Sequence, residues 1–271
     1  MPWPSIFAYA IVVLLFPCER PLFVGADGDA NLCSTMSLAK RATAEALGTA
    51  LLLATIVGSG IMARNLAGGN VALALLANTL ATGAALVALI LTFGSISGAH
   101  FNPVVTLADA LEGGIPWRET PAYIVAQLAG AIAGTLVAHA MFQLPAISLS
   151  RHERSGPAQI FSEFVATFGL LSVIWGCSRL RSNTVAFAVG GYIVAAYWFT
   201  ASTSFANPAV TIARSLTDTF SGIRPADVPG FLIGQFLGAI AATFLFRWLV
   251  PGIRAQAKQV VVPHNSESEN S

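Results

Sequence analysis

Two asparagines, each followed by proline, stand in apolar surroundings in phrases that nearly repeat each other. The first phrase, FNPVVTLADAL, runs from Phe101 to Leu111, and the second, FANPAVTIARSL, runs from Phe205 to Leu216. Asparagine is a preferred N-cap, and proline is tolerated at the first helical position because its missing N–H would have no partner there. Each phrase therefore predicts a helix start, and the amides of Asn102 and Asn207 can donate hydrogen bonds to a passing oxygen.

The composition of the chain is that of a membrane protein. Of its 271 residues, 55% are hydrophobic and only 10% are charged, and the mean hydropathy is +0.70. Bilayer hydrocarbon takes about 20 apolar residues per helix, and six windows of that length lack a central charge. They lie near Leu38–Met62, Val71–Thr92, Pro121–Met141, Ala158–Cys177, Thr184–Thr200 and Pro229–Val250. We therefore expect an all-α membrane protein with six transmembrane helices.

Charge and cysteine content give no sign of other classes of function. The net charge of +1 does not indicate a nucleic-acid partner. The cysteines, Cys18, Cys33 and Cys177, fit no metal-ligand spacing and no even-numbered disulfide framework. We expect neither a metal nor a cofactor.

Three pairs of blocks recur in the same order in the two halves of the chain. The blocks are AEALGTALLL and SEFVATFGLL (from Ala44 and Ser162), NPVVTLADAL and NPAVTIARSL (from Asn102 and Asn207), and AQLAGAIAG and GQFLGAIAA (from Ala126 and Gly234). Each half then contains three spanning helices. Because three is odd, the second half is expected to be inverted relative to the first, so the two Asn-Pro phrases enter the membrane from opposite faces.

Each Asn-Pro phrase is too short to cross the bilayer. About ten helical residues give roughly 15 Å, half of the hydrocarbon thickness, so two re-entrant half-helices would meet start to start at the midplane. The irregular backbone before them, SISGAHF and TASTSFA, is tolerated there only if it lines a water-filled path or is buried in protein. Each helix start carries about +0.5 of charge. The sequence thus predicts a pore whose centre opposes the passage of cations and protons.

The channel domain is expected to cover residues 36–251, with inverted halves at about 36–145 and 155–251. The apolar stretch SIFAYAIVVLLF within residues 1–35 is too short to span. We interpret residues 1–35 as a disordered or misassigned N-terminal extension rather than as a seventh membrane element, and residues 252–271 as a cytoplasmic tail. Lys and Arg are weakly enriched on the side of the termini, which favours both termini in the cytoplasm.

Taken together, these motifs resemble the aquaporin and aquaglyceroporin family, the major intrinsic proteins. The resemblance rests on the twin Asn-Pro boxes, the SGAHFNP stretch, Glu45 and Glu163 in the first and fourth helices, and Gln127 and Gln235 in the third and sixth. The stretch ALLANTLATGAAL and the unusual second box are most similar to aquaglyceroporins that accompany bacterial arsenic-resistance genes. The resemblance implies a channel for small uncharged solutes and water, assembled as a homotetramer in the plasma membrane, which is the inner membrane if the source is bacterial.

The resemblance also assigns residues to the pore. The two boxes are Asn102, Pro103 and Val104, and Asn207, Pro208 and Ala209. Backbone carbonyls of Gly98, Ala99 and His100 on one side, and of Thr203, Ser204 and Phe205 on the other, would line the path and replace the hydration of a solute. An unpaired polar group costs about 1–3 kcal/mol, so this replacement lowers the barrier. The valine at position 104 is expected to change only the packing of the half-helices.

The selectivity filter departs from that of water channels, which carry arginine three residues after the second Asn. Here that residue is Val210, and offsets from the boxes place Thr82, Ala195 and Ser204 beside it. All four are small and uncharged, so we expect a wide filter that passes glycerol-like polyols and metalloid hydroxides such as arsenous acid. Arg214 lies one turn further on and either reaches the pore or snorkels to the interface. We expect it to snorkel.

Polar residues inside the spans suggest function by default. For the glutamates and glutamines, the repeat favours a structural role. We expect Glu45 and Gln127 to support the re-entrant loop of the first half, and Glu163 and Gln235 that of the second, with each carboxylate accepting from N–H groups of its loop. His100 is expected to form a static hydrogen bond rather than a pH gate. Tyr197 is expected in an interfacial aromatic belt.

Two other classes of function are alternatives to a passive channel. A proton- or ion-coupled secondary transporter also uses inverted repeats and broken helices, but it would need an acidic or basic residue at the substrate site. An intramembrane enzyme needs a nucleophile beside a base, and Ser202 and Ser204 have no His within their own segment. The passive channel is therefore the preferred hypothesis, with no catalytic residue.

Overall fold

The computed structural model describes residues 36–180 and 184–250, and all regular structure within these ranges is helical. The helices are α3 (Leu38–Leu66), α4 (Val71–Ser97), α5 (Pro103–Glu112), α6 (Thr120–Met141), α7 (Pro157–Leu180), α8 (Val185–Phe199), α9 (Pro208–Arg214) and α10 (Val228–Leu249), with a short 3-10 helix η2 (Pro225–Asp227) before α10. The predictions for residues 1–35 and 252–271 lie outside the described residues.

Helix length and composition make the chain a multi-pass membrane protein. Five segments are long and apolar enough to cross a bilayer, namely α3, α4, α6, α7 up to Cys177, and α10 together with η2. The helix α8 has 15 residues, about 22 Å at 1.5 Å per residue, which is shorter than the hydrocarbon core. Residues 181–183 just before it lie outside the described ranges, so the sixth span stays a prediction.

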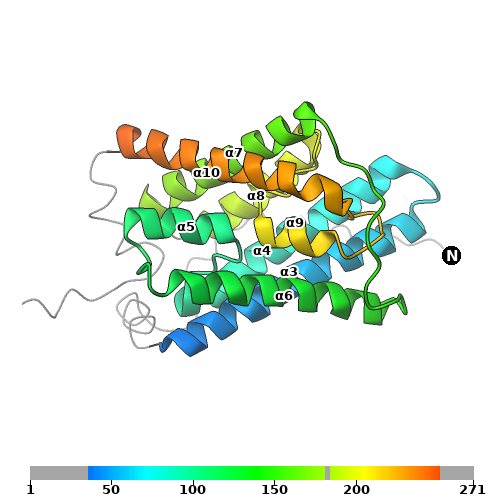
Figure 1. Ribbon diagram of the computed structural model, residues 1–271, viewed down its shortest axis with the longest axis horizontal. Helices are drawn as coiled ribbons and strands as arrows, with labels where there is room; N and C mark the ends of the chain where they lie inside the picture. The colour runs from blue at the N-terminus through cyan, green and yellow to red at the C-terminus, as the bar shows by residue number, and fades with distance from the viewer. Residues whose placement is uncertain (1–35, 181–183, 251–271) are drawn as a thin grey trace, which may run out of the picture.

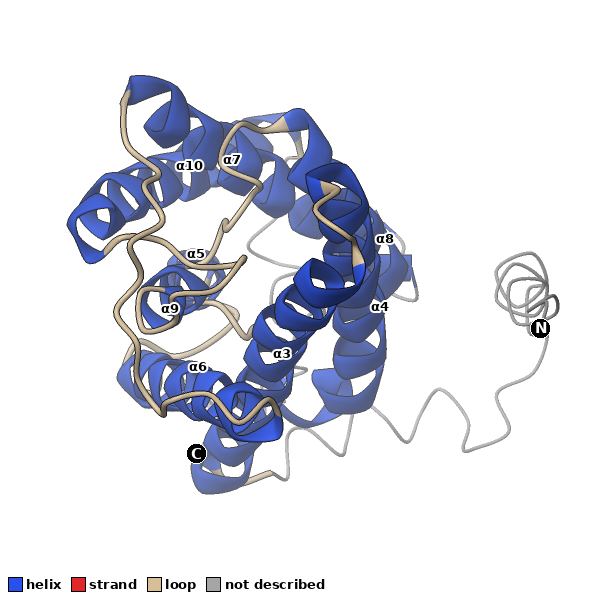
Figure 2. Cartoon of the chain, turned by 90° about the vertical axis from the view of Figure 1, so that its right-hand side faces the viewer, coloured by secondary structure: helices blue, strands red, loops and turns tan. Residues whose placement is uncertain are grey.

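The long helices flank the two short ones. Seen end-on in Figure 2, α6, α3, α4, α8, α7 and α10 follow one another around the molecule, and α5 and α9 lie on the side between α6 and α10. Seen from the side in Figure 1, α5 and α9 lie roughly end to end between α6 and α10. This is an all-α architecture with two short half-helices packed among the long ones.

Glycines allow the helices of each half to approach closely. A Cβ at Gly130 or Gly134 of α6 would overlap the backbone carbonyl oxygen of Ala46 or Ala50 of α3. The counterparts in the second half are Gly234 and Gly238 of α10, against the carbonyl oxygens of Ile160 and Phe164 of α7. Small residues spaced by four lie on one helix face and permit backbone contact in membranes. The repeat seen in the sequence is therefore also a repeat of packing.

The two short helices differ in length. The helix α5 has the ten residues expected of it, whereas α9 has only seven, so the expectation of about ten residues was wrong for the second half-helix. After Arg214 the chain turns back, and the backbone N–H of Ile223 donates to the carbonyl oxygen of Arg214 at 3.2 Å. That carbonyl is satisfied outside the helix, which removes the need for a further turn.

Candidate functional site

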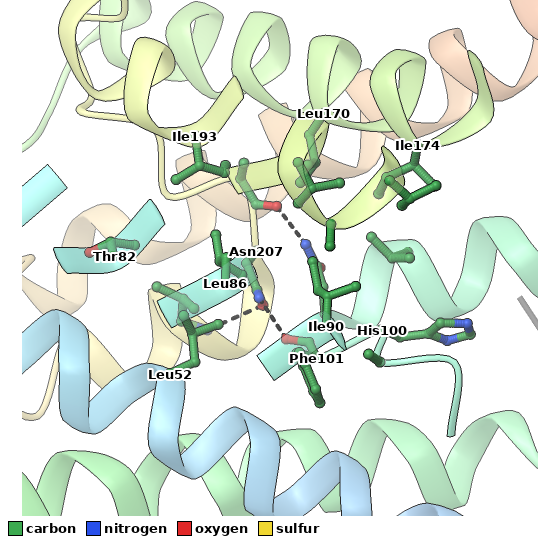
Figure 3. A pocket seen from close by; sticks show the side chains of 18 of the residues that line it. Leu52, Thr82, Leu86, Ile90, His100, Phe101, Leu170, Ile174, Ile193 and Asn207 are labelled. Carbon is green, nitrogen blue, oxygen red and sulfur yellow. Dashed lines mark hydrogen bonds between the residues drawn. The ribbon is translucent and has the colours of Figure 1, made fainter. Parts of the chain in front are cut away.

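The two half-helix starts bind each other through their asparagines. The Nδ2 of Asn102 donates to the carbonyl oxygen of Ala206 at 2.8 Å, and the Nδ2 of Asn207 donates to the carbonyl oxygen of Phe101 at 2.8 Å (Figure 3). Each side-chain oxygen caps its own helix by accepting from the backbone N–H two residues later, at 3.1 and 2.9 Å. An amide NH2 group has two hydrogens, so each asparagine keeps one for another acceptor.

The loops that lead to the asparagines have an unusual backbone. Ala99 and Phe101 in the first loop have φ of 50°, and Thr203, Ser204 and Ala206 in the second have φ of 60°, 49° and 48°. Residues other than glycine adopt this left-handed region at a cost of about 1–3 kcal/mol each, and they do so mostly at functional sites. Ala99 and Phe101 match Ser204 and Ala206 at the spacing of the two asparagines, so both halves carry the same strain.

A buried carboxylate holds the first loop in this conformation. Glu45 accepts from the backbone N–H groups of His100 and Phe101, at 3.0 and 2.7 Å. It also accepts from the hydroxyl of Ser97 at 2.7 Å and from the Nε2 of Gln127 at 2.8 Å. Hydrogen bonds to an ionised acceptor are about twice as strong as neutral ones, which offsets part of the strain.

The second loop is held in the same way. Glu163 accepts from the backbone N–H groups of Phe205 and Ala206, at 2.9 and 2.8 Å, and from the Nε2 of Gln235 at 2.6 Å. Gln235 also donates to the hydroxyl of Thr211 on α9 at 2.8 Å, as Gln127 does to a threonine of α5. Neither glutamate lines the cavity described next, so both act on the loops.

A cavity of about 400 Å³ extends along the half-helix starts. Figure 3 shows Thr82 toward one end of it, Asn207 near the middle and His100 toward the other end. The helix α4 contributes Thr82, Leu86 and Ile90, which are four residues apart and therefore share one face. The other walls come from α3, α7 and α8 (Leu52, Ile56, Leu170, Ile174, Val189 and Ile193) and from both loops. One side is thus apolar and the other carries the polar groups of the loops.

The cavity contains most but not all of the predicted pore residues. Those that line it are Asn102, Asn207, Thr82, Ser204, Val210, Gly98, Ala99, His100 and Phe205. Thr203 and both prolines do not line it, and Val104 and Ala209 are buried in the surrounding hydrophobic core. The Oγ of Ser204 is buried and has no hydrogen-bond partner in the described part of the chain.

The prediction that Ala195 lines the selectivity filter is wrong. It is exposed on the outer side of α8, while Val189, Ile193 and Tyr197 of the same helix line the cavity. Positions 189, 193 and 197 share one helix face, and position 195 does not. The offset of Ala195 from Asn207 spans the loop 200–206. Such an offset does not determine which face of α8 points to the cavity.

Tyr197, and not Ala195, is the residue from this end of α8 that lines the cavity. It is 3% exposed, lines the cavity, and its hydroxyl lies 3.4 Å from the Oγ1 of Thr82. The expectation of an interfacial aromatic belt was wrong for this residue. The set of four small filter residues is therefore also wrong, because an aromatic ring is part of the wall.

Arg214 lines the cavity instead of snorkelling. The residue is 1% exposed, its Cζ lies 3.4 Å from the centroid of the Phe205 ring, and its Nε donates to the carbonyl oxygen of Ser221. It follows Val210 by one helical turn, so the two share a face of α9. The four-residue spacing from Val210 is the sequence feature that indicates this position.

A second arginine near the same ring was missed by sequence reasoning. The Cζ of Arg154, from the segment before α7, lies 5.1 Å from the Phe205 ring centroid. Its guanidinium donates to the carbonyl oxygens of Gly222 and Ser202, at 2.9 and 3.1 Å. Burial lowers its pKa to about 10, so it is charged at neutral pH. It lies in a loop without periodicity, and no sequence signal located it.

At the other end of the cavity, His100 is held through one nitrogen of its ring. Its Nδ1 lies 3.1 Å from the hydroxyl of Thr106, and its Nε2 lies 3.7 Å from a carboxylate oxygen of Asp109. Both partners belong to α5 and are three residues apart, on one helix face. The static role expected for His100 stays a prediction. Asp109 was not identified from the sequence.

The site as a whole offers hydrogen bonds rather than reactive groups. No group of three or more His, Cys, Asp or Glu that could hold a metal ion occurs within residues 36–180 and 184–250. The polar atoms of the cavity are amide, hydroxyl, imidazole and guanidinium groups and backbone carbonyls. They can exchange hydrogen bonds with a solute that sheds its water.

Comparison with known proteins identifies relatives along most of the chain. The family model for the major intrinsic protein matches residues 32–185 and 176–270. Aquaglyceroporin AqpS of Rhizobium meliloti is 57% identical over 222 residues, which are 82% of this chain and 95% of that protein. Aquaporin NIP1-4 of Oryza sativa is 34% identical over 61% of this chain and 62% of its own length. The X-ray structure of the aquaglyceroporin from Plasmodium falciparum matches with a TM-score of 0.60 and 23% identity, covering 81% of this chain and 100% of that one.

Proposed function

Because the chain belongs to the major intrinsic protein family, we propose that the cavity along its half-helices conducts glycerol-like polyols and neutral metalloid hydroxides such as arsenous acid. Members of this family are channels and not enzymes, and the chain is a passive membrane channel for water and small solutes like glycerol. The proposal concerns the path, its residues and the wider set of solutes.

The observation that carries the proposal is the two-sided wall of the cavity. Leu86, Ile90 and Ile193 make one side apolar, and the amides of Asn102 and Asn207 make the other a donor surface. A polyol has a hydrocarbon edge and a hydroxyl edge and fits both. Each donor that replaces a lost water removes a penalty of about 1–3 kcal/mol. Arsenous acid is a neutral triol of similar shape, so the same wall can hold it.

The narrow neck of the path is proposed to be formed by Thr82, Tyr197, Ser204, Val210 and Arg214, all of which line the cavity. Val210 and Ser204 leave it wider than an arginine at position 210 would. The backbone carbonyls of the two strained loops, which the two glutamates hold in place, are the proposed hydrogen-bond acceptors next to the asparagines. No carboxylate lines the cavity among the described residues, which disfavours an ion-coupled transporter.

The assembly and orientation are part of the proposal. We place the channel in the plasma membrane, which is the inner membrane if the source is bacterial, with both termini in the cytoplasm. Residues 36–251 form the channel domain, and four copies assemble with one path in each. Native mass spectrometry of the purified protein measures the number of subunits, and a monomer would contradict the tetramer.

The test compares water, glycerol, urea and arsenous acid in proteoliposomes that contain the wild type or Val210→Arg. The variant places a second guanidinium one turn from Arg214. We expect glycerol and arsenous acid permeability to fall by about tenfold or more, equivalent to about 1.4 kcal/mol of barrier, and water permeability to fall less. Stopped-flow light scattering measures all four rates.

Ala195→Val is the matched control for this experiment. It enlarges a residue of the originally expected filter that is exposed on the outer side of α8. All four rates should stay at the wild-type level. Loss of glycerol flux in Ala195→Val together with normal flux in Val210→Arg would show that the path runs elsewhere.

A further inference from the structure

Arg214 is a buried cation without a counter-ion. Within the described part of the chain it forms no salt bridge, and its Nη1 is buried and has no hydrogen-bond partner. Its Nε donates to the carbonyl oxygen of Ser221, and the hydroxyl of Tyr197 also interacts with the guanidinium. Burying a charge in this way is unfavourable unless function requires it. A positive charge in the wall of the cavity can serve such a function.

The surroundings of Arg214 hold the charge in place without cancelling it. The aromatic face of Phe205 lies under the guanidinium, an attractive contact for a cation. Arg154 approaches the same ring and brings a second positive charge. The acid that acts electrostatically on Arg214 is Glu163, which forms no salt bridge with it and accepts from the backbone N–H groups of the second loop and from Gln235.

The positive charge therefore acts on the lumen. An uncompensated charge in a wall of low dielectric repels a cation several ångströms away far more strongly than it would in bulk water. It does not repel a neutral solute. Val210, one turn away, is apolar and neither shields nor neutralises it.

We propose that Arg214 determines the ion selectivity of this channel: its guanidinium excludes cations from the neck and lets neutral solutes pass. The guanidinium absent at position 210 is thereby supplied from one helical turn further along α9. This inference rests on the proposed conduction path. It differs from the expectation of a neck without arginine.

The full-length protein is reconstituted in proteoliposomes, and the leak of Na⁺ and H⁺ is measured beside glycerol and water permeability. The variant Arg214→Met removes the charge and keeps a long side chain. We expect the ratio of its cation leak to its glycerol permeability to rise by about tenfold or more. Arg214→Lys keeps the charge and should keep the low leak of the wild type.

A second pair of variants leaves the packing of Arg214 intact. Val210→Glu places a carboxylate one turn from the guanidinium and should raise the cation leak, whereas Val210→Gln has nearly the same shape without charge and should not. Arg151→Met is the control for arginine loss, since Arg151 is 89% exposed and binds Asp218 at 2.8 Å. Its leak should equal that of the wild type.

The outcomes separate the inference from the proposed function. A wild type that passes no glycerol would refute the proposed function and the inference together. A wild type that passes glycerol, with Val210→Glu and Arg214→Met both as tight to cations as the wild type, overturns the inference alone. If Arg214→Met does not fold, the comparison of Val210→Glu with Val210→Gln decides.

Discussion

At the scale of residues, the site is a set of buried polar groups that satisfy one another across the middle of the membrane. Glu45 and Glu163 each accept two backbone N–H groups and one glutamine N–H. Hydrocarbon offers no water as a substitute partner, so an N–H that loses its acceptor pays the full cost of desolvation. The left-handed loop residues stay in place because these acceptors hold them.

The substitution Glu163→Gln tests this support. The amide nitrogen of Gln cannot accept, so at least one of the N–H groups of Phe205 and Ala206 loses its partner. We expect a loss of about 2–3 kcal/mol of unfolding free energy, the cost of an unsatisfied buried donor, and a lower glycerol flux. Thermal unfolding of the purified protein in detergent and stopped-flow measurements report the two effects.

Glu153→Gln is the control for that substitution. Glu153 is 63% exposed and lies 3.4 Å from Arg224, and exposed ion pairs contribute about 0–1 kcal/mol. Its unfolding temperature should stay close to that of the wild type. Equal losses in the two variants would show that Glu163 has no special role in holding the second loop.

At the scale of elements, the helix pairs α3–α6 and α7–α10 are built on glycines that allow backbone contact. Because a Cβ at Gly134 would overlap the carbonyl oxygen of Ala50, any larger residue must push the two helices apart. The loops that end in the half-helices are anchored on these same pairs, through Glu45 and Gln127 in one half and Glu163 and Gln235 in the other. Helix separation is therefore expected to loosen the site.

Gly134→Val measures the contribution of this contact. Overpacking of a tight interface costs about 1–3 kcal/mol, so the thermal unfolding temperature should fall. Gly191→Ala in α8 is the counterpart, because a Cβ there meets nothing within 4 Å, and it should be neutral or stabilising by about 0.5–1 kcal/mol. A stable Gly134→Val protein with wild-type flux would contradict the close-contact interpretation.

At the scale of the whole molecule, the channel keeps its carboxylates and its paired arginines away from its path. Arg41 of α3 pairs with Glu119 at 2.7 Å, and Arg247 of α10 pairs with Glu112 at 2.5 Å. The two pairs attach α3 and α10 to the two ends of the connection between α5 and α6. None of these four residues lines the cavity. The described part of the chain presents no carboxylate there for a coupling ion. Transport is thus expected to follow the gradient of the solute alone.

This expectation is tested by the dependence of flux on concentration. Glycerol uptake into proteoliposomes should rise linearly with the gradient and should not change when an uncoupler dissipates a proton gradient. A channel does not cycle between conformations for each solute molecule, so there is no saturating step in this range. Saturation, or collapse of uptake with the proton gradient, would indicate a carrier.

The sequence by itself determined the features that depend on local chemistry. The Asn-Pro starts, the buried glutamates paired with glutamines, and the long apolar windows could be predicted because capping, charge burial and bilayer thickness constrain nearby residues directly. Only the tertiary structure decided which side chains meet in the cavity. The inward face of α8 brings in Tyr197 in place of Ala195, and the turn after α9 leaves Arg214 buried beside Phe205. Both depend on how loops set the rotation and the ends of helices, and residue offsets do not record that rotation.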